Sequence, residues 1–393
     1  MVDNFNISQK YNLWDYIFII WFITDSCFGH TSVSMIGQLL FVIYSFVRCI
    51  NLRILKGSYL FLLYGAFIYF CWYNIISGHA ISEPTARTML RVVIRNFIFI
   101  VFLFQYLKNT DLEKLKFVFL YICAVSSFII LLLNYQTTGT FQIRDVEGSI
   151  NGNLQAINNA IAIGWFYCLR SRKLSMKYIV ICGFLFLFCI LAGTRKAMIA
   201  MVMIIVLYTM LCKPQKIVLN VFKIAVIVAF VLFLLLKVDF IYDMIGNRFE
   251  GLLGFINGKN EVDASTETRG RFIELGFAYF LMEPIYGHGI DCFREIKGAF
   301  DTYSHNNYIE LLFGIGIPGT IAYYMLYVIP LAKGIRNYIT KRTNYVIMGA
   351  VIILVCLFSD YGLVSYFDRN TYFRIFLCYF FVSSVKSRVL KNG

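Results

Sequence analysis

The chain has 393 residues, of which 59% are hydrophobic and only 15% are charged, and its mean hydropathy is +0.70. Soluble globular chains are about half apolar and about a quarter charged, so the composition excludes an ordinary soluble domain and indicates a chain surrounded by lipid. The net charge of +14 would suit a nucleic-acid-binding protein, but the basic residues lie between apolar runs, where they indicate membrane topology.

Apolar runs long enough to cross a bilayer recur along the chain. A span takes roughly 20 apolar residues, and fewer where flanking side chains reach the headgroups. We count about twelve such runs and expect an all-α, polytopic membrane protein. The predicted spans centre on 13–29, 33–50, 58–77, 90–107, 117–134, 155–170, 178–193, 197–212, 217–236, 306–331, 344–360 and 371–385.

The basic residues between spans predict the orientation. They cluster in alternate connections, as cytoplasmic loops do, which puts both termini in the cytoplasm. The outer side then holds one long loop, 237–303, within a single transmembrane domain, 1–393. The basic clusters include Arg48 and Arg53, Lys114 and Lys116, Arg172 and Lys173, Lys213 and Lys216, Lys341 and Arg342, and Lys386 and Arg388.

The long outer loop is predicted to contain a helix over 267–283, which stops at Pro284 and the glycine turn 287–289. The helix is largely apolar after its first turn, so we expect it to lie along the membrane surface or to dip into it.

The span after the outer loop is predicted to be a broken helix. Ser304 is expected to be its N-cap, with the helix beginning at His305. Glycines and a proline between 314 and 319 are expected to break it. Broken helices inside a bilayer need protein or water to satisfy the freed backbone, and they often line cavities.

Three arginines at the start of the fourth span depart from the positive-inside pattern. Arg87, Arg91 and Arg95 follow one another at four-residue spacing, which stacks them on one helix face. Arg87 and Arg91 can reach the outer headgroups, although an anionic ligand for Arg91 stays open. Arg95 lies deeper, where a charge is costly unless it faces a polar cavity.

Further outer cations occur in two other segments. Arg195 lies in the tight turn 193–196, where it is either an interface anchor or an anion ligand. Arg269 and Arg271 open the loop helix, where cations oppose the helix dipole, so an anion nearby would explain them. The phosphates of a lipid carrier fit such a basic cleft, because the guanidinium fork donates paired hydrogen bonds. Arg294 is interpreted as a solvated charge.

His305 lies in the string YSHNNYIELL, beside Asn306 and Glu310, where a span is predicted to begin at the outer interface. A near-neutral imidazole can accept a proton from a hydroxyl in a transfer reaction. A structural, hydrogen-bonding histidine is the alternative, and the residues alone leave both open.

Motifs for metal and nucleotide chemistry are missing from the sequence. The outer loops contain no cluster of His and Cys with metal-ligand spacing, the first outer loop has no D-x-D motif, and there is no P-loop. The 11 cysteines lie mostly in apolar runs and form no C-x-x-C motif, which indicates small buried residues. Any glycosyl transfer is expected to need no metal and no cofactor.

Three segments resemble signatures of the O-antigen polymerase and O-antigen ligase superfamily: GTRKAM at 193–198, TRGRFIELGFAYFLMEPIYGHG at 268–289 and SHNNYIELLFGIGIPG at 304–319. The resemblance implies a GT-C-like membrane glycosyltransferase of the bacterial inner membrane. Such enzymes act at the periplasmic face on undecaprenyl-diphosphate-linked glycans, without a metal. One departure is Leu275 or Gly276, near the place where many members carry a tryptophan.

The resemblance also implies roles for individual residues. His305 matches the histidine of the H-N motif and would accept the proton of the attacking hydroxyl. Arg195 matches the arginine of the hairpin turn, and Arg269 matches the loop-helix arginine best, with Arg271 as the neighbouring alternative. These arginines would stabilise the leaving diphosphate. The remaining candidates for substrate binding are Arg91, Arg95, Asn306 and Glu310.

The form of the third segment favours a polymerase, which would build O-antigen or capsular polysaccharide from lipid-linked repeat units. A ligase that transfers the glycan to the lipid A core is the alternative within the superfamily. A flippase for lipid-linked sugars is the alternative of another class, although the chain shows no repeated halves. A chain-length regulator and a flippase would be partners besides the bilayer, and no nucleic acid is expected.

Overall fold

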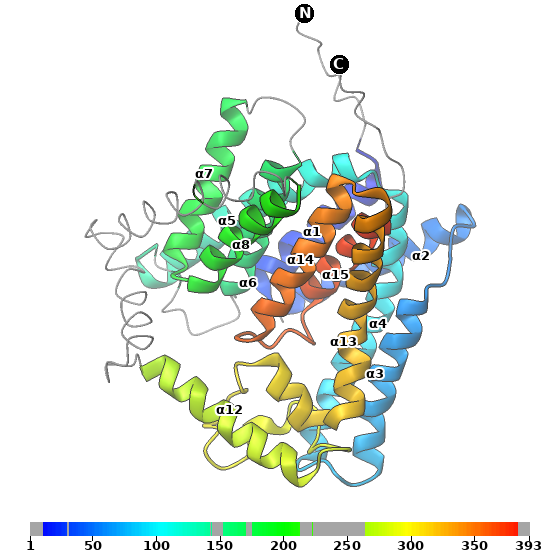
Figure 1. The fold of residues 1–393 in the computed structure, drawn as a ribbon, viewed down its shortest axis with the longest axis vertical. Coiled ribbons are helices and arrows are strands. Elements are labelled where there is room, and N and C mark those ends of the chain that lie inside the picture. The colour runs from blue at the N-terminus through cyan, green and yellow to red at the C-terminus, as the bar shows by residue number, and fades with distance from the viewer. Residues whose placement is uncertain are drawn as a thin grey trace, which may run out of the picture. The chain divides into compact units, whose positions relative to one another are not determined.

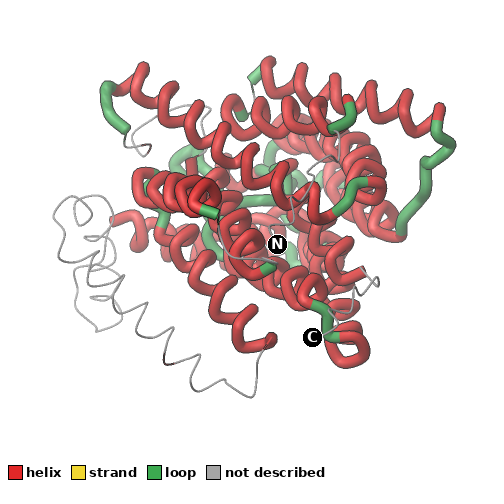
Figure 2. Tube along the Cα trace, turned by 90° about the horizontal axis from the view of Figure 1, so that it is seen from above, coloured by secondary structure: helices red, strands yellow, loops and turns green. Residues whose placement is uncertain are grey.

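The computed structural model describes residues 11–383 except 30, 142, 144–151, 170–174, 213–221 and 223–263. Throughout the described residues the regular structure is helical and no strand occurs (Figure 2). Helices satisfy every internal backbone hydrogen bond within one segment, which is what a lipid environment requires. The expected all-α fold is confirmed.

Each predicted span that the described residues cover coincides with a helix, although α4 begins earlier, α13 ends later, and α5 extends past both ends of the predicted span. The span predicted over 217–236 lies outside the described residues apart from Phe222. The helices are α1 Leu13–Phe28, α2 Ser32–Asn51, α3 Tyr59–Ile76, α4 Glu83–Asn109, α5 Leu112–Thr138, α6 Gly152–Cys168, α7 Met176–Leu191, α8 Arg195–Cys212, α12 Ala264–Met282, α13 Asn307–Lys341, α14 Asn344–Asp360 and α15 Arg369–Ser383, with the 3-10 helix η4 Cys292–Glu295 before α13.

Within the described ranges, 6 helices are long and apolar enough to cross a membrane: α2, α3, α4, α5, α8 and α13. The helices α7 and α14 are apolar but shorter. Large apolar side chains on these helices are exposed, such as Leu62 at 77% and Ile36 at 58%, as lipid-facing residues are. The chain is therefore a membrane protein, and the predicted number of about twelve spans stays a prediction.

The chain forms two compact units. Unit 1 comprises residues up to Leu55 and 102–205 among those described, and unit 2 comprises 56–101 and the described residues from 206 onward. Of the candidate site residues, only Arg195 belongs to unit 1. The predicted single domain over 1–393 stays a prediction.

Unit 1 has an aromatic core around α1. The ring of Phe18 stacks on that of Tyr106 at 4.4 Å between centroids. The buried carboxylate of Asp15 accepts a hydrogen bond from the hydroxyl of the same Tyr106 at 3.2 Å and forms an ion pair with Lys114. The charge of this buried acid is thus compensated within the same unit.

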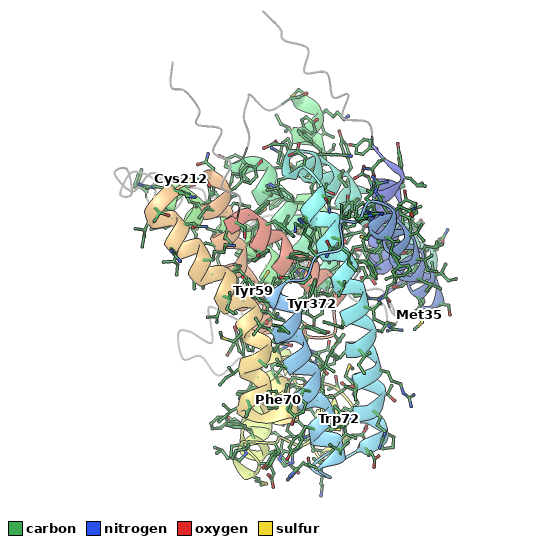
Figure 3. All side chains as sticks on the ribbon, turned by 90° about the vertical axis from the view of Figure 1, so that its right-hand side faces the viewer. Met35, Tyr59, Phe70, Trp72, Cys212 and Tyr372 are labelled. Atoms are coloured by element: carbon green, nitrogen blue, oxygen red, sulfur yellow. The ribbon has the colours of Figure 1, made fainter. Side chains whose placement is uncertain are left out.

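In unit 2, α13 packs against α3, α12, α14 and α15, and α3 runs beside α13 (Figure 1). Phe67 of α3 meets Tyr323 of α13 at 5.3 Å between ring centroids, and Tyr64 meets Tyr372 of α15 edge-on at 5.1 Å. The exposed Trp72 lies farther along α3 (Figure 3). Buried aromatic pairs therefore fix the helices that carry the candidate site.

The loop after α12 packs directly on the backbone of α13. The amides of His288 and Gly289 donate to the carbonyls of Phe313 and Gly314 at 2.7 and 2.8 Å, and the amide of Ile317 donates to Pro284 O at 2.9 Å. These bonds satisfy backbone groups that the kink at Gly316 (φ 64°, ψ −171°) releases from the helix. The predicted break is confirmed, and protein backbone is what supports it.

Glycine is required on both sides of this contact. A Cβ at Gly287 would lie 2.7 Å from backbone atoms of Gly314 and Gly316, and a Cβ at Gly316 would lie 2.2 Å from Ile285 O. The two glycine motifs of the sequence are therefore two halves of one close backbone contact.

The predicted start of α13 was wrong by two residues. Asn306, and not Ser304, is the N-cap: its Oδ1 accepts hydrogen bonds from the amides of Tyr308 and Ile309 at 3.0 and 3.2 Å. The helix begins at Asn307 and not at His305. The Ser304 hydroxyl donates instead to Asn306 O at 2.8 Å, so it stabilises the turn before the helix.

Candidate functional site

His305 is held by a turn whose polar groups are buried. The amide of Ser304 donates to Glu310 Oε2 at 2.9 Å. Ser304, Asn306 and Glu310 are 0%, 3% and 1% exposed. Each of the three side chains thus forms a hydrogen bond with a backbone group close to His305 in the chain. Asn306 and Glu310 were predicted as substrate ligands; their place in the structure gives them the geometry of supports for His305.

The backbone of His305 is in the left-handed region, with φ 56°. Residues other than glycine adopt this conformation uncommonly, and histidine is among the types that do so most often, together with asparagine and aspartate. The imidazole is half-buried. It lies 4.3 Å from the Tyr303 ring and parallel to the Phe272 ring, at 6.3 Å and 6°. The turn and the two rings together set the direction of the imidazole.

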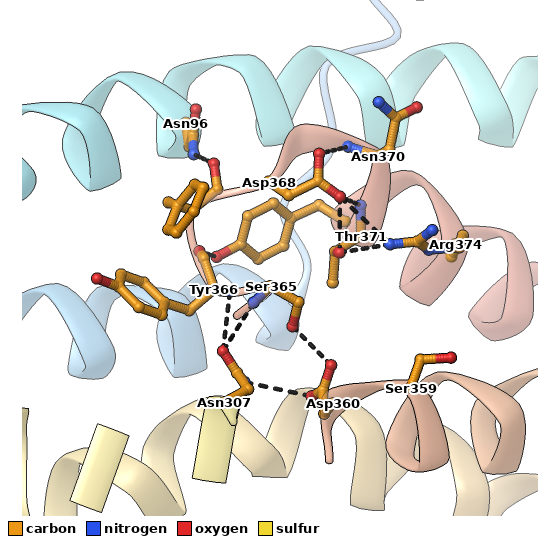
Figure 4. A network of polar contacts seen from close by, with 12 residues as sticks. Asn96, Asn307, Ser359, Asp360, Ser365, Tyr366, Asp368, Asn370, Thr371 and Arg374 are labelled. Atoms are coloured by element: carbon orange, nitrogen blue, oxygen red, sulfur yellow. Dashed lines mark hydrogen bonds and ion pairs between the residues drawn. The ribbon is translucent and has the colours of Figure 1, made fainter. Parts of the chain in front are cut away.

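Asn307 links the same turn to the loop 361–368. Its Nδ2 donates to Asp360 Oδ2 at 3.2 Å, and its Oδ1 accepts from the amides of Ser365 and Tyr366 at 2.9 and 3.2 Å (Figure 4). The Ser365 hydroxyl donates to Asp360 Oδ1 at 2.6 Å. This fully buried network restrains Asn307, which lies two residues after His305.

The two arginines of α12 differ in their surroundings. Arg271 is exposed and donates to Glu267 Oε1 at 2.6 Å, one helical turn away. Arg269 is half-buried. Burial raises the pKa of Tyr303, and the charge of Arg269 opposes that rise. Arg269 is therefore electrostatically close to the ring that contacts His305, whereas Arg271 has a local carboxylate partner.

Arg294, interpreted from the sequence as a solvated charge, is paired with a buried acid. Its Nη2 donates to Asp291 Oδ1 at 2.7 Å. Burial raises the pKa of Asp291, and Arg294 opposes the rise. The charge of Arg294 also lowers the pKa of Tyr303 against the effect of burial. The spacing of three residues between Asp291 and Arg294 was a signal for the pair.

The arginines of α4 differ in burial, and their predicted depth in the membrane stays a prediction. Arg87 is exposed, and its Nε donates to Glu83 at 2.6 Å. Arg91 is exposed and Arg95 is half-buried on the same helix. Arg95 is thus the most enclosed of the three, and a role for Arg91 and Arg95 in binding phosphate stays a prediction.

Arg195 is the first residue of α8, and its side chain is half-buried. The preceding turn contains Gly193 in the left-handed region, with φ 57°, and the buried Thr194. The tight hairpin turn is therefore present, and the contribution of Arg195 to the site stays a prediction.

Sequence reasoning missed two buried arginines at the start of α15. Arg369 and Arg374 are 3% and 4% exposed. Arg374 donates to Asp368 Oδ2 at 3.2 Å and to Thr371 Oγ1 at 2.6 Å (Figure 4). Asp368 also accepts the Thr371 amide at 3.0 Å, as a helix cap does. The string DRNT at 368–371 was the available signal for this capped, charge-compensated helix start.

No group of three or more His, Cys, Asp or Glu side chains that could hold a metal occurs among the described residues. The expectation of metal-independent transfer stays a prediction.

Residues 180–324 match the model of the O-antigen ligase family. The match supports the O-antigen polymerase and ligase superfamily for this part of the chain. The resemblance seen in the sequence is thereby confirmed, and it covers the hairpin of Arg195, helix α12 and the turn of His305. The search among curated proteins found no match. The family indicates a membrane enzyme of the O-antigen polymerase or ligase type, which acts on lipid-linked glycans.

Proposed function

We propose that this protein polymerises undecaprenyl-diphosphate-linked oligosaccharide repeat units into O-antigen or capsular polysaccharide. The reaction takes place at the periplasmic face of the bacterial inner membrane, with both termini in the cytoplasm. The observation that carries the proposal is the presentation of His305 by a buried polar turn, against the ring of Tyr303, whose pKa the charge of Arg269 lowers against the effect of burial.

The reaction is a transfer at an anomeric carbon. A sugar hydroxyl of one lipid-linked glycan attacks the anomeric carbon of another, and the bond from that carbon to the diphosphate oxygen breaks. His305 accepts the hydroxyl proton. The diphosphate leaves with the electron pair of the broken bond, and its growing charge is stabilised by Arg269 and Arg195.

The other candidate residues act around this step. Arg91 and Arg95 contribute to binding of the lipid-linked diphosphate, and Arg271 is the alternative to Arg269 as the cation of α12 that binds it. Asn306 and Glu310 hold the turn that carries His305 and so position it toward the sugar hydroxyl that it deprotonates. Binding two large glycans at one site supplies much of the remaining rate by proximity. A flippase delivers the substrates and a chain-length regulator ends the polymer.

Two other functions compete with the proposal. A ligase would use the same donor but would transfer it to the lipid A core. A flippase would move the lipid-linked glycan without forming a glycosidic bond. The two classes differ in what they need from His305: a flippase should tolerate its loss better than an enzyme that uses it as proton acceptor. The lack of two similar halves in the sequence also favours an enzyme.

The test is the size distribution of surface glycan in a strain of the source organism that lacks the gene. Core carrying one repeat unit and no ladder supports the polymerase. Bare core, with long glycan accumulating on the lipid carrier, supports the ligase. An unchanged ladder, in a strain shown to hold no second gene of this kind, contradicts both enzyme functions.

A further inference from the structure

An exposed phenylalanine occupies a turn position that disfavours it. The amide of Thr302 donates to Ala299 O at 3.1 Å, which closes a turn around Phe300 and Asp301. Both central residues have positive φ angles, 52° and 54°. Turns with this sign pattern are dominated by glycine, asparagine and aspartate. A bulky residue such as Phe300 is strained there.

The same phenylalanine also exposes its ring. Phe300 is 78% exposed, so it gains little from burial in return for its strained backbone. The buried ring of Phe272 lies 6.4 Å from it between centroids. Phe272 in turn lies parallel to the imidazole of His305 at 6.3 Å. The exposed ring is therefore separated from His305 by one buried aromatic residue.

Polar groups of suitable chemistry flank the ring. Asp301, next in the chain, is exposed, and the half-buried Tyr303 follows two residues later, against His305. A pyranose has an apolar face of C–H groups, which packs on an aromatic ring, and a rim of hydroxyls, which donate to a carboxylate. An exposed ring beside a carboxylate matches both parts of such a sugar.

We propose that Phe300 and Asp301 form a sugar-binding subsite in which one pyranose of the lipid-linked glycan stacks on the Phe300 ring. The subsite rests on the proposed glycan transfer at His305. Strain and exposure at Phe300 are retained because the ring is buried only when the glycan is bound.

Lipid is the other chemistry that could cover an exposed phenylalanine. The adjacent Asp301 carboxylate is exposed, and a carboxylate in hydrocarbon is costly. The position of Asp301 therefore favours a hydrated glycan over acyl chains as the occupant.

The test compares Phe300→Tyr, Phe300→Leu and Phe300→Asn. Tyrosine keeps the aromatic face, leucine keeps an apolar side chain without it, and asparagine fits the turn better than the native residue. Phe300→Asn is thus expected to fold at least as well as the wild type. The substrate is lipid-linked glycan extracted from cells that lack the gene, added at increasing concentration to the purified protein in vesicles.

We expect Phe300→Leu and Phe300→Asn to raise the apparent KM by about tenfold while Phe300→Tyr stays within about twofold of the wild type. An unchanged KM for Phe300→Leu would assign the residue to lipid contact, and an unchanged KM for all three variants would remove any role in binding; either result overturns the subsite.

If these variants are normal while His305→Ala is inactive, the subsite fails and the transfer function stands. If the wild-type protein itself forms no polymer, the proposed function fails first and the subsite with it.

Discussion

Asn307 and Asp360 are joined by a hydrogen bond of 3.2 Å from Nδ2 to Oδ2 at the centre of unit 2. The bond ties the first residue of α13 to the last residue of α14. Asn307 also accepts hydrogen bonds from two backbone amides of the loop 361–368, which leads from α14 into α15 (Figure 4). The side chain of Asn307 therefore connects the turn that carries His305 to α14 and to this loop.

Replacing Asn307 should therefore destabilise the protein strongly. Asn307→Ala leaves two buried amides without an acceptor, and we expect a loss of about 3 kcal/mol. The matched control is Asn337→Ala, which loses one hydrogen bond, to Val382 O at 2.6 Å, and should cost about 1 kcal/mol. Thermal unfolding in detergent measures both, and equal shifts of the two midpoints would contradict the linking role of Asn307.

His305→Ala should abolish glycan transfer. Removing the proton acceptor is expected to lower kcat by about a hundredfold to ten-thousandfold. Expression and the unfolding midpoint should stay near those of the wild type, because the half-buried imidazole contributes little core packing.

The control for this variant is His79→Ala. His79 stacks on Tyr286 at 4.4 Å and lies 3.8 Å from Glu283, so it is another half-buried histidine with an aromatic contact. Activity of His79→Ala close to that of the wild type is expected. Normal polymer from a well-expressed His305→Ala protein would refute the catalytic assignment.

The two arginines of α12 should differ in their effect on activity. Arg269→Gln removes the charge that acts on Tyr303 and should lower kcat/KM by about a hundredfold. Arg271→Gln, two residues along the chain and exposed, loses only its pair with Glu267 and should stay within about twofold. In vitro transfer with extracted lipid-linked glycan gives both values, and the reverse order would assign the phosphate contact to Arg271.

Gly316→Ala should prevent correct packing of α13. The new Cβ would lie 2.2 Å from Ile285 O, and the positive φ of this residue is unfavourable for alanine, so we expect a loss of about 3 kcal/mol or more. Gly65→Ala is the control, since nothing lies within 4 Å of its Cβ and a helical alanine gains about 1 kcal/mol over glycine. Yield of folded protein on size-exclusion chromatography separates the two, and a normal yield of Gly316→Ala would show that the close contact is dispensable.

The helices could be predicted because their cause is local. A run of apolar residues long enough to span a bilayer must form a helix to satisfy its backbone. The helix α2, for example, begins and ends within one residue of the predicted run 33–50, at Ser32 and Asn51. His305 and Arg269 could be selected because the motifs that contain them are contiguous in the sequence.

The details of the site could not be read in the same way. Ser304 is a good N-cap residue by type, yet its amide donates to the Glu310 carboxylate and its hydroxyl donates to a backbone carbonyl. Asn306 is therefore the residue that caps α13. The choice between these two polar residues depends on Glu310, whose carboxylate accepts the Ser304 amide from one turn into α13.

The sequence by itself determined that the chain is an all-α membrane protein, where most of its helices lie, and which motifs carry the candidate chemistry. Only the tertiary structure decided that Gly287 and Gly316 belong to one contact, that Arg294 pairs with a buried acid, and that Phe300 stays exposed. The physical reason is range. Hydrophobic runs and helical hydrogen bonds act between near neighbours in the chain, whereas close backbone contacts, buried charge pairs and the exposure of a side chain depend on segments that folding alone brings together.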